Sequence, residues 1–148
     1  METSLRPATI DDASALADLA ALTFPLACPS YHSAENIAVH LANVLSVANF
    51  VDYVESAEFS VFVAETAGGF MGFAMADYRE PTDAEVQQQL ANEGRAAELS
   101  KLYVHPECHG AGLAHELLAH ILDDMRQHDV EVAWLTVNQL NARANAFY

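Results

Sequence analysis

Basic residues are scarce in this chain of 148 residues, which has six Lys and Arg against 21 Asp and Glu and a net charge of −15. Non-specific nucleic-acid binding needs a basic surface that neutralises phosphates. The composition therefore argues against nucleic acid as a partner. It permits attraction of a cationic substrate, although an acidic surface can also serve solubility alone.

Long apolar runs and cysteine patterns are also missing. No stretch of about 18 apolar residues predicts a membrane span, and the start of the chain lacks the apolar core of a signal peptide. The two cysteines, Cys28 and Cys108, form neither a disulfide nor a metal pattern. We therefore expect a cytoplasmic protein with reduced thiols, no membrane partner and no metal. The length and the 52% hydrophobic content fit one domain over 1–148.

Two nucleotide-binding motifs and one metal motif are incomplete. A dinucleotide fingerprint needs a third glycine where His115 stands, and a P-loop needs Gly-Lys-Ser/Thr, which is absent. His115 and His120 imitate a zinc-protease motif, but five positions separate them by about 140° around a helix. The sequence therefore predicts no zinc site there.

The segment from Glu98 to Ala114 contains a strand, a glycine-bearing turn and the start of a helix. Pro106 ends the strand because it has no N–H to donate. Gly110 and Gly112 permit a tight turn, and its N–H groups together with the helix N-terminus can converge on an anion. A strand-to-helix corner without a ligand is the other interpretation. The helix is predicted from the apolar face formed by Leu113, Leu117, Leu118, Ile121, Leu122 and Met125.

The remaining chain alternates strands and helices. A strand–helix–strand step normally makes its two strands parallel, so the order predicts a mixed sheet with helices on both faces. Asp11 or Asp12 is expected to cap the first helix, and a loop over 24–31 is expected to end it. We predict strands at 5–8, 59–65, 70–78, 99–104 and 130–137, and further helices from Ser33, over 49–56, over 113–128 and from 138.

Three segments resemble the GNAT-type N-acetyltransferases. The first is His-Gly-Ala-Gly-Leu-Ala at 109–114, which follows Val-His-Pro and is similar to the family's Arg/Gln-x-x-Gly-x-Gly/Ala. The second is 137–148, which contains the pattern Asn-x-x-Ala-x-x-Phe-Tyr, and the third is the opening at 5–12. Together they touch most of the chain.

This resemblance implies an α/β (α+β) fold with a mixed, mostly antiparallel sheet and a central pair of parallel strands that splay apart. The family normally adds two strands after the last helix, whereas this sequence ends at Tyr148. We therefore expect a C-terminally incomplete domain, with the missing strands removed or supplied by another chain, as in a homodimer.

The implied activity is direct transfer of an acetyl group from acetyl-CoA to an amine acceptor. A domain that binds coenzyme A without chemistry, as a sensor or interaction module, is the alternative. The resemblance implies that the pantetheine arm meets the main chain of Leu102 and Val104 and the side chain of Asn141, which as an alternative caps a helix. The pyrophosphate-binding residues that it implies are His109, Gly110, Ala111, Gly112, Leu113 and Ala114.

Two side chains are candidates for catalysis. Glu98 is a general base by resemblance, because an alkylammonium must lose a proton before it attacks a thioester. Its other interpretation is an exposed strand-end carboxylate. Tyr148 is implied as the acid that protonates the leaving thiolate, and anchoring of the last helix is its alternative role.

Overall fold

The computed structural model describes residues 3–27, 33–82, 84–91, 94–106 and 112–135. Its strands are β1 (Ser4–Pro7), β2 (Phe59–Thr66), β3 (Gly69–Asp77), β4 (Ala96–Val104) and β5 (Val132–Trp134). Its helices are α1 (Ala13–Ala27), α2 (Ala34–Val44), α3 (Val47–Glu55), α4 (Ala84–Leu90) and α5 (Leu113–Gln127), with a short 3-10 helix over Ile10–Asp12 before α1.

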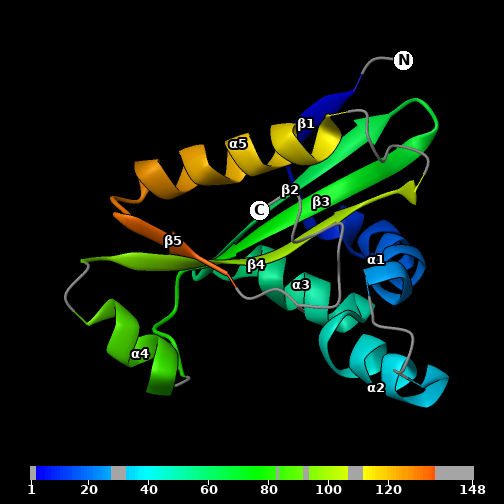
Figure 1. Cartoon of the computed structure of the whole chain (residues 1–148). Coiled ribbons are helices and arrows are strands. Elements are labelled where there is room, and N and C mark those ends of the chain that lie inside the picture. Colours follow the sequence, from blue (N-terminus) through cyan, green and yellow to red (C-terminus); the bar gives the residue numbers. More distant parts are fainter. Residues whose placement is uncertain (1–2, 28–32, 83, 92–93, 107–111, 136–148) are drawn as a thin grey trace.

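The described strands form one sheet in the order β1-β2-β3-β4-β5. The first four are antiparallel to their neighbours, and β5 is parallel to β4. Helix α5 connects these two parallel strands and covers one face of the sheet, whereas α1 and α3 cover the other (Figure 1). This arrangement confirms the predicted mixed, mostly antiparallel sheet with helices on both faces.

Each face of the sheet carries its own hydrophobic core, because β2, β3 and β4 place successive side chains on opposite sides. The predicted apolar face of α5 is confirmed, since its buried residues recur every four positions. The core under α1 and α3 is centred on Leu16, Ala20, Leu45, Phe50, Val63, Phe73 and Met75. The core under α5 is centred on Ala64, Ala74, Ala97, Leu99, Leu113, Leu117, Ile121 and Met125.

Strand β4 contains an irregularity that matters for the site. Met75 of β3 faces Lys101, and the preceding pair joins Ala76 to Leu99, so Ser100 has no counterpart on β3. An extra residue of this kind is a β-bulge, which leaves the residues beyond it on the face opposite to the one that simple alternation predicts.

The parallel pair is short among the residues that the structure describes. It joins β5 to the first three residues of β4 and ends at the pair of Glu98 with Trp134. Strand β4 continues for six more residues to Val104, with only β3 as its described neighbour. The edge of β4 beyond Glu98 is therefore not paired with a described strand.

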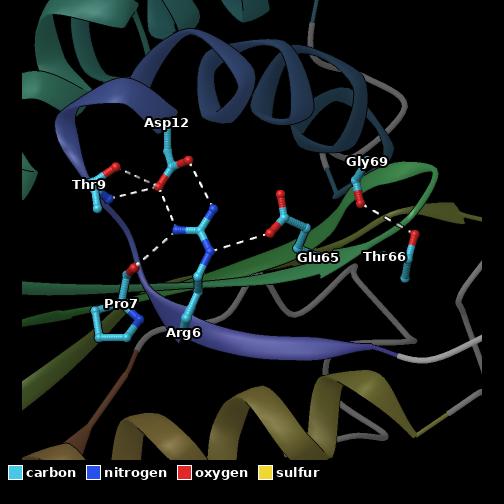
Figure 2. Close-up of polar contacts among 7 residues, drawn as sticks. All are labelled: Arg6, Pro7, Thr9, Asp12, Glu65, Thr66 and Gly69. Carbon is cyan, nitrogen blue, oxygen red and sulfur yellow. Dashed lines mark hydrogen bonds and ion pairs between the residues drawn. The ribbon is translucent and has the colours of Figure 1, made fainter.

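A polar network joins the first strand to the first helix (Figure 2). The Arg6 guanidinium donates to both carboxylate oxygens of Asp12, at 2.8 and 3.1 Å, and through Nε to Glu65 on β2 at 3.3 Å. The Asp12 carboxylate also accepts the backbone N–H of Thr9 at 2.7 Å. Thr9, rather than Asp11 or Asp12, is the residue before the helical turn, which corrects the predicted cap.

The predicted loop over 24–31 is wrong at its start, because α1 continues through Pro25 to Ala27. Proline removes one helical hydrogen bond and is therefore disfavoured beyond the first turn of a helix. Packing favours the helix there, since the Phe24 ring stacks on His40 of α2 at 4.3 Å and meets Tyr103 edge-on at 6.3 Å. Residues 28–31 lie outside the described part of the chain.

One described segment, 34–55, is long and apolar enough to cross a membrane by length and composition alone. It consists of α2 and α3, which are separated at Leu45 and Ser46, and Ser46 caps α3 by accepting the N–H of Asn49. Leu45 and Phe50 are buried in the core under α1. Core helices of folded domains pass the same test, so this segment is weak support for a membrane span.

Gly72 is the position where α5 approaches β3 most closely. A Cβ atom there would lie 2.9 Å from Cδ1 of Leu117 and 3.0 Å from the carbonyl oxygen of Tyr103. We expect Gly72→Ala to lower the free energy of unfolding by about 1–3 kcal/mol, because the buried Leu117 must shift. Urea unfolding measures this. Gly68→Ala is the control, since its Cβ would meet nothing closer than 3.7 Å, and equal losses in the two variants would contradict the prediction.

Candidate active site

The edge of β4 on the side away from β3 carries backbone groups of Leu102 and Val104, beyond the last pair with a described strand. The N–H of His105 donates to the carbonyl of Met71 on β3 at 2.7 Å. Because backbone groups alternate in direction along a strand, the N–H groups of Leu102 and Val104 point to the side away from β3. That side is the edge beyond the last pair with β5. It can accept an extended ligand as an added strand.

The N-terminus of α5 lies beside the end of β4. Leu113 in its first turn and Val104 belong to the same core, under the same face of the sheet. Gly112 precedes the helix with a φ of +82°, a left-handed conformation that favours glycine. No atom of the described residues lies within 4 Å of a Cβ built there.

This corner fits an anionic group. The first N–H groups of a helix, here at Leu113 and Ala114, have no partner within the helix, and the helix dipole favours negative charge beside them. Three other residues predicted for this role, His109, Gly110 and Ala111, lie outside the described residues. The role of the whole segment as a phosphate site stays a prediction.

Glu98 lies at the last pair between β4 and β5, on the face of the sheet that carries α1 and α3. It faces Asp77 across β3. No described residue donates a hydrogen bond to its carboxylate or brings a cationic nitrogen within 4.0 Å of it. Burial, and next the negative charge of Asp77, raise the pKa of Glu98, while Lys101 and Arg79 oppose the shift. A carboxyl group in this state is suited to accept a proton.

Asp77 is buried and differs from Glu98 in having a full set of partners. Arg79 donates from Nε and a terminal nitrogen to its two oxygens at 3.0 and 2.9 Å, and the Arg79 backbone N–H donates at 2.9 Å. The same guanidinium lies 4.7 Å from the centre of the Phe59 ring. Asp77 and Arg79 therefore neutralise each other beside Glu98.

Lys101 is a residue that sequence reasoning missed. Its ammonium lies 5.2 Å from the centre of the Tyr53 ring on α3 and donates to Ser100 Oγ at 3.2 Å. Burial lowers the pKa of Lys101, against the raising influence of Glu98 and Asp77. No sequence pattern marks this position, because Lys101 is an odd number of residues from Glu98 and the bulge is what brings both to one face.

The other predicted side chains are not described. Tyr148, proposed as the acid, and Asn141, proposed to bind the pantetheine arm, both lie outside the described residues, so their roles stay predictions. Within the residues that are described, no group of three or more His, Cys, Asp or Glu side chains could hold a metal ion.

The geometry places three features along β4. These are a strand edge that is not paired with a described strand beyond Glu98, a carboxyl group near its start that lacks described hydrogen-bond donors, and a helix N-terminus beside its end. An edge and a helix N-terminus can hold a ligand with an extended arm and a phosphate group. A carboxyl with a raised pKa beside them can remove a proton from a second reactant.

Comparisons with known proteins agree with this arrangement. The Acetyltransferase (GNAT) family matches residues 18–148. An uncharacterized N-acetyltransferase of Mycobacterium tuberculosis strain H37Rv is 36% identical over 137 residues, which cover 93% of this chain and 80% of the relative.

Two solved structures share the fold at lower sequence identity. The PaiA N-acetyltransferase from Thermoplasma acidophilum, in complex with coenzyme A, is 18% identical, with a TM-score of 0.85 over 100% of this chain and 87% of that one. The ribosomal-protein-alanine N-acetyltransferase from Brucella melitensis is 16% identical, with a TM-score of 0.66 over 99% of this chain and 89% of that one. On the family match and the mycobacterial relative, this chain belongs to the GNAT acetyltransferase family.

Proposed function

We propose that this chain transfers an acetyl group from acetyl-CoA directly to a primary amine of a small molecule or protein. The observation that carries the proposal is the arrangement along β4, which has Glu98 at its last pair with β5 and the N-terminus of α5 beside its end. Coenzyme A bound to the Thermoplasma relative supports acetyl-CoA as the donor. The matching family is one of acetyltransferases, which supports transfer rather than binding alone.

The donor would be held mainly by main-chain groups. With a net charge of −15 the chain has few cations to offer a phosphate, so backbone amides are the natural ligands. We propose that the amides of 109–114 hold the pyrophosphate. The N–H groups of Leu102 and Val104 would bind the extended arm, and the N–H of Leu102 would polarise the carbonyl that is attacked. Asn141 is proposed to add a side-chain contact to the arm.

Acetyl-CoA supplies an activated acyl group when bound, and the chain's residues handle the protons. Glu98 would accept one proton from the acceptor's ammonium group, which leaves a neutral amine to form the new N–C bond as the C–S bond breaks. Tyr148 would donate its hydroxyl proton to the departing sulfur. The nitrogen loses its second proton to solvent as the amide forms, and solvent returns one proton to Tyr148. The products are an N-acetyl amine, coenzyme A as its thiol, and one proton held by Glu98 until it is released to water.

The family match does not identify which amine is the acceptor. The Brucella structure is named for acetylation of a ribosomal protein, and another solved relative is named for acetylation of an aminoglycoside. Both act on amines, which supports an amine here without selecting one. A panel of acceptors is therefore part of the test.

The test measures release of free thiol from acetyl-CoA with a panel of primary amines, alongside thermal unfolding with and without coenzyme A. We expect stabilisation by coenzyme A and steady thiol release with at least one amine. Tyr148→Phe should lower kcat by roughly 10²-fold with little change in coenzyme A affinity, because it removes only the proton donor. Stabilisation without turnover would support the non-catalytic alternative, and an unchanged kcat in Tyr148→Phe would contradict the role of that residue.

A further inference from the structure

The bulge at Ser100 places Lys101 on the same face of the sheet as Glu98. In a regular strand, residues three apart point to opposite faces. Here Glu98 pairs with Asp77, and Lys101 pairs with Met75. Because Asp77 and Met75 are two positions apart on β3, all four side chains lie on the face under α1 and α3. Two positions along a strand correspond to about 7 Å. The site therefore has a carboxyl and an ammonium at a fixed spacing along one strand.

The Lys101 ammonium is largely buried and lacks a charged partner within 4.0 Å among the described residues. Its nearest polar neighbour is Ser100 Oγ at 3.2 Å, and no described carboxylate oxygen lies within 4.0 Å. The Tyr53 ring beneath it is held in place, because the Tyr53 hydroxyl donates to the carbonyl of Val44 at 2.8 Å. The Tyr53 ring therefore fixes the position of the Lys101 ammonium. The other N–H groups of this ammonium donate to no described residue.

The neighbouring carboxylates on this face do not form an ion pair with the Lys101 ammonium in the described structure. Asp77, the nearby buried carboxylate, is engaged on both oxygens by Arg79. That pairing leaves one negative group, Glu98, and one positive group, Lys101, each without a direct partner in the described structure. Both lie on the strand whose open edge begins at Glu98.

We propose that Glu98 and Lys101 together select a zwitterionic acceptor, an amine that also carries an anionic group such as a carboxylate or phosphate. This inference rests on the transfer proposed above. The amine of the acceptor meets Glu98, which takes its proton, and the anionic group meets the Lys101 ammonium. Lys101 is thus a specificity-determining residue rather than a catalytic one.

The electrostatics favour this acceptor over a plain amine or a diamine. Burial lowers the pKa of Lys101, which means that its charge is poorly solvated and gains from a bound anion. A hydrogen bond between an ammonium and an anionic group is stronger than one between neutral groups. A diamine would instead bring its second ammonium toward Lys101, where like charges repel.

The experiment compares matched acceptors. We would measure kcat/KM for ω-amino acids of increasing length, for n-alkylamines of the same length, and for the corresponding diamines and aminoalkylphosphonates. Wild type should favour the best amino acid or phosphonate over its alkylamine by about 10- to 100-fold. In Lys101→Met this ratio should fall towards one, whereas Lys101→Arg should retain most of it. The carboxylate and phosphonate series show which anion the site prefers.

Arg126→Met is the matched control, because it removes the same charge from a side chain that is 73% exposed on α5, away from this face. It should keep the wild-type ratio. A ratio near one in wild type, or an equal ratio in wild type and Lys101→Met, would overturn the inference while thiol release with alkylamines still supports the transferase. Absence of thiol release with every amine would overturn both proposals. Thermal unfolding of each variant confirms that it is folded.

Discussion

Glu98→Gln is expected to lower kcat/KM for the amine acceptor by about 10²-fold or more at pH 7. Glutamine keeps the size of the side chain and removes its ability to take a proton. The acceptor would then react only through the small fraction of amine that is already neutral in solution. The loss should therefore shrink as the pH rises towards the pKa of the free amine. A loss that is constant between pH 7 and 9, or no loss, would contradict the role of Glu98 as base.

The pH profile of kcat/KM in the wild type provides a second test of Glu98 as the general base. The base works in its ionised form, and burial raises the pKa of Glu98 above the ordinary value of 4.5. The acidic limb of the kcat/KM profile should therefore lie above pH 4.5, and in Glu98→Gln it should be replaced by a limb that follows the pKa of the free amine. Asp77→Asn removes the second cause of the raised pKa, and so it should move the limb of the profile to lower pH.

Stability should change in the opposite direction to activity. A folded-state pKa above the unfolded one means that Glu98 favours folding most below the unfolded pKa, and this contribution is lost as the pH rises through the folded value. At pH 7 the ionised Glu98 carboxylate lowers the free energy of unfolding, whereas a neutral glutamine at this position does not. Glu98→Gln should therefore unfold at a higher temperature than wild type at pH 7, and the gap should close near pH 4. Glu55→Gln, on an exposed residue of α3, is the control and should show neither effect.

The sequence predicted those parts of the fold in which local pattern and packing agree. The apolar pattern predicted for α5 matches its buried face, because the helix lies along one face of the sheet and buries one stripe of residues. Ser33 caps α2 as expected, since its hydroxyl accepts the N–H of Asn36 at 3.0 Å. The parallel step from β4 through α5 to β5 follows from chain order alone.

Errors occurred where a distant contact outweighed a local signal. Pro25 suggested the end of α1, yet the stacking of Phe24 on His40 holds that turn in the helix. Asp12 suggested a cap, but its carboxylate is taken by Arg6 from the strand before it. Neither partner can be read from neighbouring residues, because each belongs to another element.

The candidate site was predictable only in its main-chain part. Glycines and a change of period mark a strand-to-helix corner, and these signals are local. The role of Lys101 depends on the bulge at Ser100 and on the register with β3, which no periodicity encodes. The placement of Glu98 opposite Asp77, which Arg79 already neutralises, likewise depends on the register between β3 and β4.

The second large effect is expected at the junction of β1 and α1, where Asp12 is held by Arg6 (Figure 2). The Asp12 side chain is only 11% exposed, and the hydrogen bond from Arg6 is the main reason that its pKa falls from 3.8 to about 2. A shift of nearly two units corresponds to about 2.5 kcal/mol of stability at pH 7. Asp12→Asn should lose about that amount in urea unfolding, because it leaves the Arg6 guanidinium with only Glu65 as a charged partner.

The direction of the pH dependence separates this ion pair from ordinary packing. A folded-state pKa below the unfolded one gives stability that is present above about pH 4 and is lost as the pH falls towards 2. Wild type should therefore lose stability across that window more steeply than Asp12→Asn, and the two curves should approach each other at its acidic end. Glu65→Gln is the matched control. The Glu65 side chain is 41% exposed and 3.3 Å from Arg6, so its replacement should change stability by less than about 1 kcal/mol. Parallel curves for wild type and Asp12→Asn would mean that the network stabilises the junction by packing rather than by charge.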